Sequence, residues 1–504
     1  MQSWAGCITG THESSFWKRQ RSGMGEAAPF STLLPIPRLI DAANQGNAVK
    51  LKVLSGRHAF IKGKPTRTYG YSAPILAPII RLRRGDEVEM TVENTLDIVT
   101  SVHWHGLLVP GYNDGGPHQP INPGASWRPV LKIDQPAATL WFHPHAHHQT
   151  ARQIYMGLAG MIFVDDGSDA RLGLPRTYGI DDLPIILQSR SFDSDGSIEY
   201  DTDTLSSLDI VYGAREETVI VNGAILPVAK VPPGLVRLRL LNGANAQNFE
   251  LRFNDQRTFH VIASDAGFLS APVAVTALTI SAAERFEIVV DFADRKAVAL
   301  ETGPNKEMGI FGRLAANGSA DYVSVMRFEP TTATPMVREL PKRLIEPVAA
   351  YPASAVRRRQ FIVNSGICTT RSQATAHEGM VALIGINGKT HDMARIDIET
   401  ELGTTEIWEI VSIGMAHPFH IHGASFRILS INGGPPPAHL TGWKDVALVE
   451  DKAELLVAFN RPATRERPFM YHCHILEHED ARLMGTICMR LVQGIGGNHR
   501  DRKS

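Results

Sequence analysis

The sequence predicts an all-β fold. Short β-branched and aliphatic runs bounded by Gly, Pro, Asn and Asp recur along the 504 residues, and this pattern is typical of strands. Long runs with helical periodicity are scarce, while 43 Gly and 31 Pro supply many turns, which favours β-sandwiches over helical or alternating α/β architectures. The clearest expected strands lie at residues 48–53, 87–92, 218–221, 235–241, 286–292 and 454–459.

The chain is long enough for about three domains, at the usual size of roughly 100 to 200 residues each. Polar and Pro-containing breaks near 165–174 and 330–347 predict two boundaries between them. We therefore expect a disordered leader at 1–30, a first domain at 31–170, a second at 171–335, a linker at 336–357, a third at 358–494 and a tail at 495–504.

Composition excludes several classes of partner. Lys plus Arg is 51 and Asp plus Glu is 52, so there is no electrostatic basis for expecting nucleic acid or an anionic membrane. No apolar run reaches about 18 residues, so the sequence predicts no transmembrane helix. Residues 1–30 also lack the continuous apolar segment of a secretory signal. The four cysteines are far apart, without the paired spacing of a disulfide framework; they are Cys7, Cys368, Cys473 and Cys488.

Twelve of the 20 histidines fall in four short stretches, which we call the histidine windows. Neutral imidazole is the commonest protein ligand for copper and zinc, and a thiolate adds preference for soft or borderline metals. A single His-x-His pair is weak evidence, but four windows together predict metal centres. The windows contain His103 and His105; His143, His145, His147 and His148; His417, His420 and His422; and His472, Cys473, His474 and His478.

Strand geometry divides the last window between two centres. On a strand, side chains at i and i+2 point to one face and the side chain between them points to the other. His472 and His474 therefore share a face, and Cys473 points the opposite way. One tripeptide can then serve two metal centres and connect them through covalent bonds.

On a continuous strand, the side chain of His417 would point to the face opposite that of His420. His417 can therefore join Cys473 and His478 as the His2Cys set of a blue-copper electron-transfer centre. Eight imidazoles without carboxylate remain, and they suit several copper ions with open positions for oxygen better than one tetrahedral zinc. Because four come from the first segment and four from the last, we expect these segments to pack together. The eight are His103, His105, His143, His145, His420, His422, His472 and His474.

Two alternatives explain less. Packing histidines, or an array that binds zinc for stability, would leave the alternating His472-Cys473-His474 without a purpose, whereas copper redox chemistry uses every residue. His147 and His148 fit no ligand position, and we interpret them as neighbouring or solvent-facing residues.

The windows resemble the motifs of the multicopper oxidases, HxHG, HxH, HxxHxH and HCHxxxH, and the resemblance covers about residues 35–492. It is nearest to the three-domain bacterial branch that contains cuprous oxidases, spore-coat laccases and cell-division scaffold relatives, as WFHPH at 141–145, MGLAG at 156–160 and GWKD at 442–445 also indicate. The resemblance implies three cupredoxin-like Greek-key β-sandwiches, the second a spacer without copper. It also favours a periplasmic or secreted location, although residues 1–30 show no clear signal peptide.

The resemblance implies four copper ions per chain: one type 1, one type 2 and a type 3 pair. It assigns His103 and His420 to type 2, and it places Asp114 and Glu479 beside the oxygen-reducing site as proton relays, which this reaction needs because it consumes four protons. The simpler alternatives are a turn residue for Asp114 and a solvated loop charge for Glu479. The implied type 3 ligands are His105, His143, His145, His422, His472 and His474.

The family's axial position, ten residues after Cys473, is occupied by Leu483. Leucine cannot ligate, and loss of a weak thioether ligand destabilises oxidised copper, so the sequence predicts a three-coordinate centre of relatively high potential. Met484, one residue later, could take the position only if the backbone bulged.

Substrate elements of the cuprous oxidases are also missing. The 14 Met do not cluster, and residues 413–416, just before His417, read Ile-Gly-Met-Ala without an acid. Thioether and carboxylate groups are what a Cu(I) site needs. We therefore expect a monomeric laccase-type oxidoreductase (benzenediol:oxygen oxidoreductase) that oxidises phenols or aromatic amines at an accessible histidine and reduces dioxygen to water. The alternatives are a cuprous oxidase or copper-resistance protein and, less in keeping with the complete ligand set, a copper-free cell-division scaffold.

Overall fold

The computed structural model describes residues 30–490 apart from 199, 201–206, 217, 304–321, 335, 347–356 and 372–377. Almost all of the expected leader, with Cys7, the middle of the expected linker and the expected tail lie outside the described residues. Strands dominate and the helices are short, which confirms the all-β prediction. All six expected strands overlap observed ones, namely β2 (Ala48–Ile61), β5 (Glu87–Asn94), β11 (Thr218–Val221), β14 (Leu235–Asn242), β19 (Arg285–Asp291) and β29 (Lys452–Ala458).

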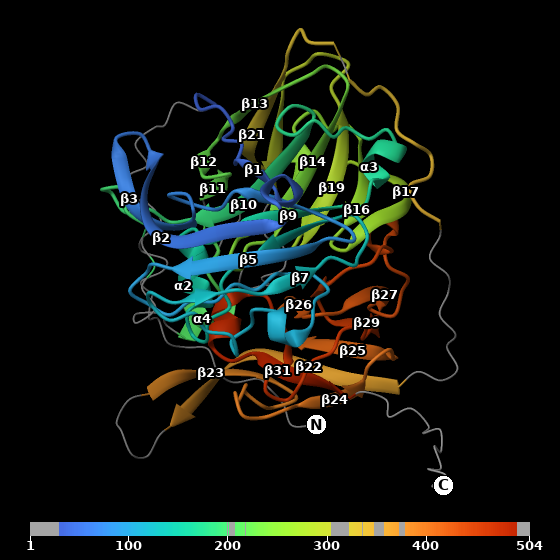
Figure 1. The fold of residues 1–504 in the computed structure, drawn as a ribbon. Coiled ribbons are helices and arrows are strands. Elements are labelled where there is room, and N and C mark those ends of the chain that lie inside the picture. Colours follow the sequence, from blue (N-terminus) through green and yellow to red (C-terminus); the bar gives the residue numbers. More distant parts are fainter. Residues whose placement is uncertain are drawn as a thin grey trace, which may run out of the picture.

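The amino-terminal part, blue to cyan in Figure 1, has two sheets, with strand orders β1-β4-β9-β8 and β3-β2-β5-β6. Alternation fixes which side of a strand is buried: in β2, Val49, Leu51 and Val53 are buried while Lys50 and Lys52 are exposed, as expected for one face on a core. The remaining strands are β1 (Leu39–Asp41), β3 (Lys64–Tyr71), β4 (Ile79–Arg83), β6 (Ser126–Trp127), β7 (Val130–Lys132), β8 (Ala138–Phe142) and β9 (Gly160–Asp165).

The middle part, green to yellow in Figure 1, pairs a seven-stranded sheet, β12-β11-β10-β14-β19-β16-β17, with a five-stranded one, β13-β21-β20-β15-β18. All of β14 is buried, including Arg237 and Arg239, which are paired with Glu287, Asp169 and Asp182. Its other strands are β10 (Asp182–Arg190), β12 (Ala224–Ile225), β13 (Val228–Val231), β15 (Phe249–Phe253), β16 (Phe259–Ser264), β17 (Gly267–Val275), β18 (Ala277–Ile280), β20 (Val298–Thr302) and β21 (Val323–Pro330).

The carboxy-terminal part, orange to red in Figure 1, has two five-stranded sheets, β23-β22-β25-β29-β27 and β24-β31-β30-β26-β28. In the second sheet, β26 lies between β28 and β30, so the third and fourth histidine windows are on neighbouring strands. The strands are β22 (Arg357–Arg371), β23 (Glu378–Ile386), β24 (Ile398–Glu401), β25 (Thr405–Ile413), β26 (His417–Ile421), β27 (Ser425–Ile431), β28 (Val446–Val449), β30 (Phe469–Cys473) and β31 (Met484–Arg490).

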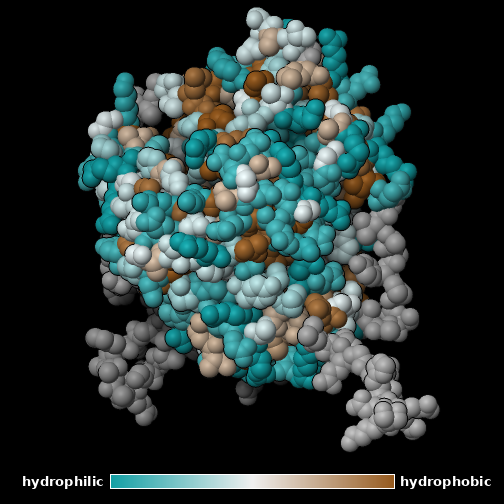
Figure 2. Space-filling model, in the orientation of Figure 1, coloured by the Kyte–Doolittle hydropathy of each residue, from teal (hydrophilic) through white to brown (hydrophobic). Residues whose placement is uncertain are grey.

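All three parts meet at one apolar cluster. It joins Trp141 and Ile154 of the amino-terminal part to Leu241 of the middle part and to Val446 and Leu476 of the carboxy-terminal part. Burial of this shared surface holds the amino-terminal and carboxy-terminal parts together, as the histidine windows predicted, while the exact domain limits stay a prediction. On the face drawn in Figure 2, hydrophilic residues dominate and apolar residues form separate patches. Among the described residues, none of the helices has the length and apolar character needed to cross a bilayer.

Candidate copper centres

His417, Cys473 and His478 form one compact donor group, which we call the His2Cys site. His417 begins β26, Cys473 ends the neighbouring β30, and His478 lies in α6 (Leu476–Asp480) just after it. Their donor atoms lie within 4.8 Å of one another, and 3.4 Å separates Cys473 Sγ from His478 Nδ1. All three side chains are fully buried.

Backbone and hydroxyl partners orient the two imidazoles of this site. Ser365 Oγ lies 2.9 Å from His417 Nε2, and Val211 O accepts a hydrogen bond from His478 Nε2 at 2.8 Å. Each ring therefore presents Nδ1 to the site, and such outer partners fix the tautomer of a ligating histidine. Burial raises the pKa of the Cys473 thiol, so a bound cation is needed to keep its thiolate form.

The expectation of an accessible histidine is wrong. Neither His417 nor His478 is exposed, because the short helix α4 (Ser207–Tyr212) lies against α6 and its Val211 carbonyl covers His478 Nε2. The six-residue α4 segment carries no strong sequence signal.

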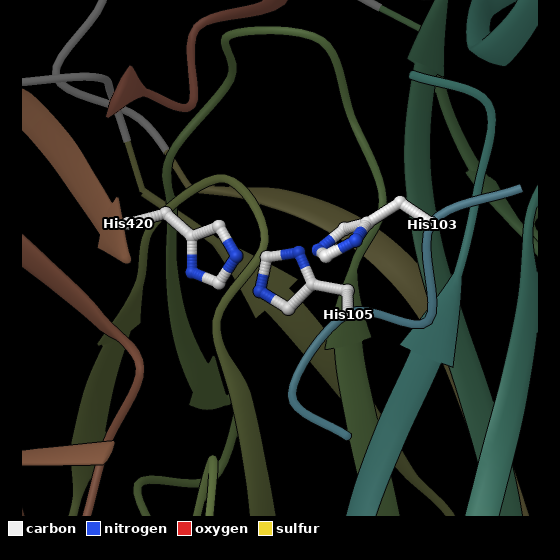
Figure 3. Close-up of side chains that lie close together, drawn as sticks. All are labelled: His103, His105 and His420. Atoms are coloured by element: carbon white, nitrogen blue, oxygen red, sulfur yellow. The ribbon is translucent and has the colours of Figure 1, made fainter. Parts of the chain in front are cut away.

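The other eight ligand candidates, which we call the eight-histidine cluster, meet where the amino-terminal and carboxy-terminal parts face each other. Figure 3 shows His103 and His105 approaching His420 from the opposite side. All eight are buried. Within each of three groups the donor atoms lie within 4.8 Å of one another. The groups are His103, His105 and His420; His105, His143 and His474; and His145, His422 and His472.

Several Nε2 atoms in the cluster face another imidazole, or no partner at all, rather than an ordinary hydrogen-bond partner. His472 Nε2 is 3.1 Å from His422 Nε2 and 3.4 Å from His145 Nε2. The Nε2 atoms of His103 and His420 are buried without any hydrogen-bond partner. Buried polar atoms are normally satisfied because leaving them bare is costly. Bound metal ions would give these converging nitrogens the partners that they lack.

The protonation state of these rings also suits a metal. Burial, with repulsion from neighbouring imidazoles, lowers the pKa of His105, His145 and His420 well below the ordinary value, and burial lowers that of His472 to about 3. Neutral imidazole is the ligand form. An all-imidazole cluster beside a His2Cys site matches the preferences of copper, so the residues present fit copper.

Profiles of the multicopper oxidase family match residues 52–169, 196–299 and 363–490. A multicopper oxidase of Staphylococcus aureus is 34% identical over 464 residues, spanning 90% of this chain and 92% of the relative. The chain is a multicopper oxidase.

Two further relatives of this oxidase bear on its function. A solved laccase-like multicopper oxidase from a lignin-degrading Ochrobactrum sp. is 42% identical, with a TM-score of 0.82 over 91% of this chain and all of that one. The cell division protein FtsP of Escherichia coli (strain K12) is 35% identical over 476 residues, 94% of each chain.

Both carboxylates expected to relay protons border the oxidase's eight-histidine cluster. Asp114 Oδ2 lies 2.7 Å from His422 Nδ1, and Glu479 Oε1 lies 3.2 Å from His145 Nδ1. Each carboxylate is only 1% exposed, which argues against the solvated loop charge for Glu479. Burial raises the pKa of Glu479 well above its ordinary value, with repulsion from Asp480 adding to it. Glu479 can therefore hold a proton next to the cluster.

The strand register separates Leu483 from Met484. Met484 of β31 pairs with His472 of β30, so it shares the face of the eight-histidine cluster. The Cys473 amide hydrogen-bonds to the Leu483 carbonyl, which places Leu483 on the face of Cys473, since directly opposed residues share a face. The register favours Leu483 over Met484 at the axial position.

Asp445 stands in the sequence only as part of the GWKD motif at 442–445, and no sequence pattern predicts its contacts with the histidines. Its Oδ1 lies 3.1 Å from His105 Nε2, and its backbone carbonyl accepts from His420 Nδ1 at 2.7 Å. His147 and His148 join none of the donor groups among the described residues; His148 Nδ1 contacts the Asp480 carbonyl instead, at 2.6 Å.

Proposed function

We propose that this multicopper oxidase is a laccase-type enzyme that oxidises small aromatic reductants one electron at a time and reduces dioxygen to water. Copper bound at the two sites would supply one-electron acceptance beside Cys473 and dioxygen reduction within the eight-histidine cluster. We propose four copper ions per chain, held by the residues that the family resemblance implies for the type 1, type 2 and type 3 positions. The chain's own residues position these two sites and connect them for electron transfer.

The connection between the two sites is covalent. Cys473 belongs to the His2Cys site, and its neighbours His472 and His474 belong to two different groups of the eight-histidine cluster. The path from sulfur to either imidazole thus runs through one peptide linkage. On the side of α4, the hydrogen bond from His478 Nε2 to Val211 O offers a route for electrons from a reductant that docks on this helix.

The observation that carries the aromatic substrate class is the chemistry of the segment over His478. Helix α4 has the sequence SLDIVY, without methionine or histidine, and Ile210 and Tyr212 are partly exposed on it. Such a surface suits a flat aromatic molecule, whereas a cuprous ion needs soft ligands.

Charge near the His2Cys site supports the same substrate class. After burial and repulsion from His478, the positive charge of Arg215 lowers the pKa of His417, and it also acts on His478. A fixed cation disfavours the approach of Cu(I) and favours a phenolate. The Ochrobactrum relative has oxidase activity towards lignin model compounds and lignosulfonate, which are aromatic substrates.

A substrate panel tests this proposal. We expect kcat/KM for a dimethoxyphenol and for an aromatic amine to exceed that for Cu(I) by at least about tenfold, a difference of about 1.4 kcal/mol in transition-state binding. Steady-state oxygen uptake with phenols, anilines, Fe(II), Mn(II) and Cu(I) gives the ranking. Saturable Cu(I) oxidation that is more efficient than phenol oxidation would instead establish a cuprous oxidase.

A copper-free cell-division scaffold is the candidate function from another class, and some relatives of this chain are named cell division protein FtsP. All eleven ligand candidates are present in this chain and converge in two sites, which a copper-free scaffold would not need. Copper binding by the purified protein separates the two functions.

A further inference from the structure

We propose that Arg285, from the middle part of the chain, is a positioning residue that sets the tautomer and orientation of His105 through Asp445. The inference rests on the proposed function and deepens it, because it gives the middle part a role beyond that of a spacer. His105 belongs to two of the three donor groups of the eight-histidine cluster, so its orientation affects both of these groups.

The guanidinium of Arg285 is held by all three parts of the chain. Nη1 and Nη2 donate to Asp445 Oδ1 and Oδ2 at 2.7 and 2.5 Å, a bidentate pair. Nε donates to the Thr139 carbonyl at 3.2 Å, and the remaining bonds go to the carbonyls of Ala283 and Asp265. Bidentate arginine–carboxylate pairs fix geometry as well as charge. Arg285 is fully buried and can adopt few other arrangements.

Asp445 passes this constraint to His105. Its Oδ1 lies 3.1 Å from His105 Nε2, and both of its carboxylate oxygens accept hydrogen bonds from Arg285, so the arrangement favours the proton of the neutral His105 ring on Nε2. The bare Nδ1 of His105 then faces His143 Nε2 at 3.3 Å. Without the partner on Nε2, the ring could take the other tautomer or turn, and Nδ1 would no longer point into the cluster.

Two more residues of the middle part, Asp265 and Glu284, hold Asp445 and its neighbour Lys444 in place. Asp265 Oδ2 accepts from the amides of Asp445 and Val446, each at 3.3 Å. Lys444, fully buried, is paired with Asp265 at 2.9 Å and with Glu284 at 3.0 Å. The Asp445 carbonyl, which orients His420, is thereby fixed as well.

The glycine of the first histidine window makes room for the pair. Gly106 has φ +87°, and a Cβ there would lie 2.7 Å from Asp445 Oδ2 and 2.8 Å from Arg285 Nη2. Any side chain at Gly106 would displace the pair that orients His105. A buried ion pair contributes little net stability, since desolvation offsets the attraction, so positioning explains this arrangement better than stability does.

Two substitutions of Arg285 test the proposal. For Arg285→Met we expect the blue thiolate band of the His2Cys site to persist, while the type 3 pair, which His105 would help to hold, loses its magnetic coupling and turnover falls about 10- to 100-fold, the usual effect of losing an outer partner of a metal ligand. Arg285→Lys, which keeps the charge but not the fork, should recover part of both. Arg237→Met is the matched control, because Arg237 is an equally buried arginine of the middle part, paired with Glu287 and Asp169 away from the histidines.

The tautomer of His105 provides a readout that does not depend on copper. Nitrogen-15 spectra of the histidine-labelled apoprotein should show His105 protonated on Nε2 in the wild type and in Arg237→Met, and altered in Arg285→Met. An unchanged tautomer of His105 and an unchanged magnetic coupling of the type 3 pair in Arg285→Met would overturn the inference, as would equal losses in Arg237→Met. A wild-type protein that binds no copper, yet shows the expected tautomers, would overturn the proposed function and leave the positioning role of Arg285 standing.

Discussion

Replacing Glu479 with Gln is expected to lower turnover by about 10²- to 10⁴-fold, the usual contribution of a positioned proton donor, with no loss of copper. Glu479 contacts the Nδ1 atoms of His145 and His472 at 3.2 and 3.5 Å, so it lies where protons for dioxygen reduction are consumed. Gln keeps the shape and the contacts but cannot release a proton. Steady-state turnover at saturating reductant, together with copper analysis, measures the effect.

The turnover rate is also expected to depend on pH through the carboxyl group of Glu479. Burial raises the pKa of Glu479, so the carboxyl keeps its proton at neutral pH and loses it as the pH rises. Wild-type turnover should therefore decline on the alkaline side, and the Gln variant should lack that limb. Glu477→Gln is the control, since Glu477 is equally buried but bonds Tyr200 and Asn245 instead. Equal losses in both variants, or full turnover in Glu479→Gln, would exclude the relay role.

Leu483→Met is expected to lower the reduction potential of the His2Cys site by at least about 60 mV, which is tenfold in a one-electron equilibrium. A thioether at the axial position stabilises oxidised copper, and Leu483 shares the face of Cys473. Oxidation of poorly reducing phenols should slow accordingly. Redox titration of the blue band measures the shift.

Met484→Leu is the matched control for that variant, because Met484 pairs with His472 and lies on the other face. It should leave the potential unchanged. An unchanged potential in Leu483→Met, or a rise in Met484→Leu, would show that Met484 occupies the axial position.

The sequence was most informative where the chemistry is local. Alternation along a strand separates Cys473 from His472 and His474 without any knowledge of the fold, and these residues do join different donor groups. His103 and His105, by contrast, lie on no regular strand, so parity could not have placed them. Their position is held by an isolated bridge between His103 and His143 and by other backbone hydrogen bonds, such as the one from the Trp141 amide to the His105 carbonyl.

Contacts between distant segments could not be predicted. Asp445 and Arg285 are 160 residues apart, and an ordinary arginine in a strand pattern gives no sign of its partner. The cover of His478 by Val211 is similar, since it joins segments 267 residues apart through a backbone carbonyl, which no side-chain pattern reveals. The Arg285–Asp445 pair and the cover of His478 both depend on how loops and domains pack together.

Copper content with the optical spectrum tests the central claim most directly. After expression with added copper, we expect about four copper ions per chain and an intense blue thiolate-to-copper band. Cys473→Ser is the control, expected to lose the band and about one copper ion while the eight-histidine cluster stays loaded. A colourless wild-type protein that binds no copper, or that binds only zinc, would contradict the account.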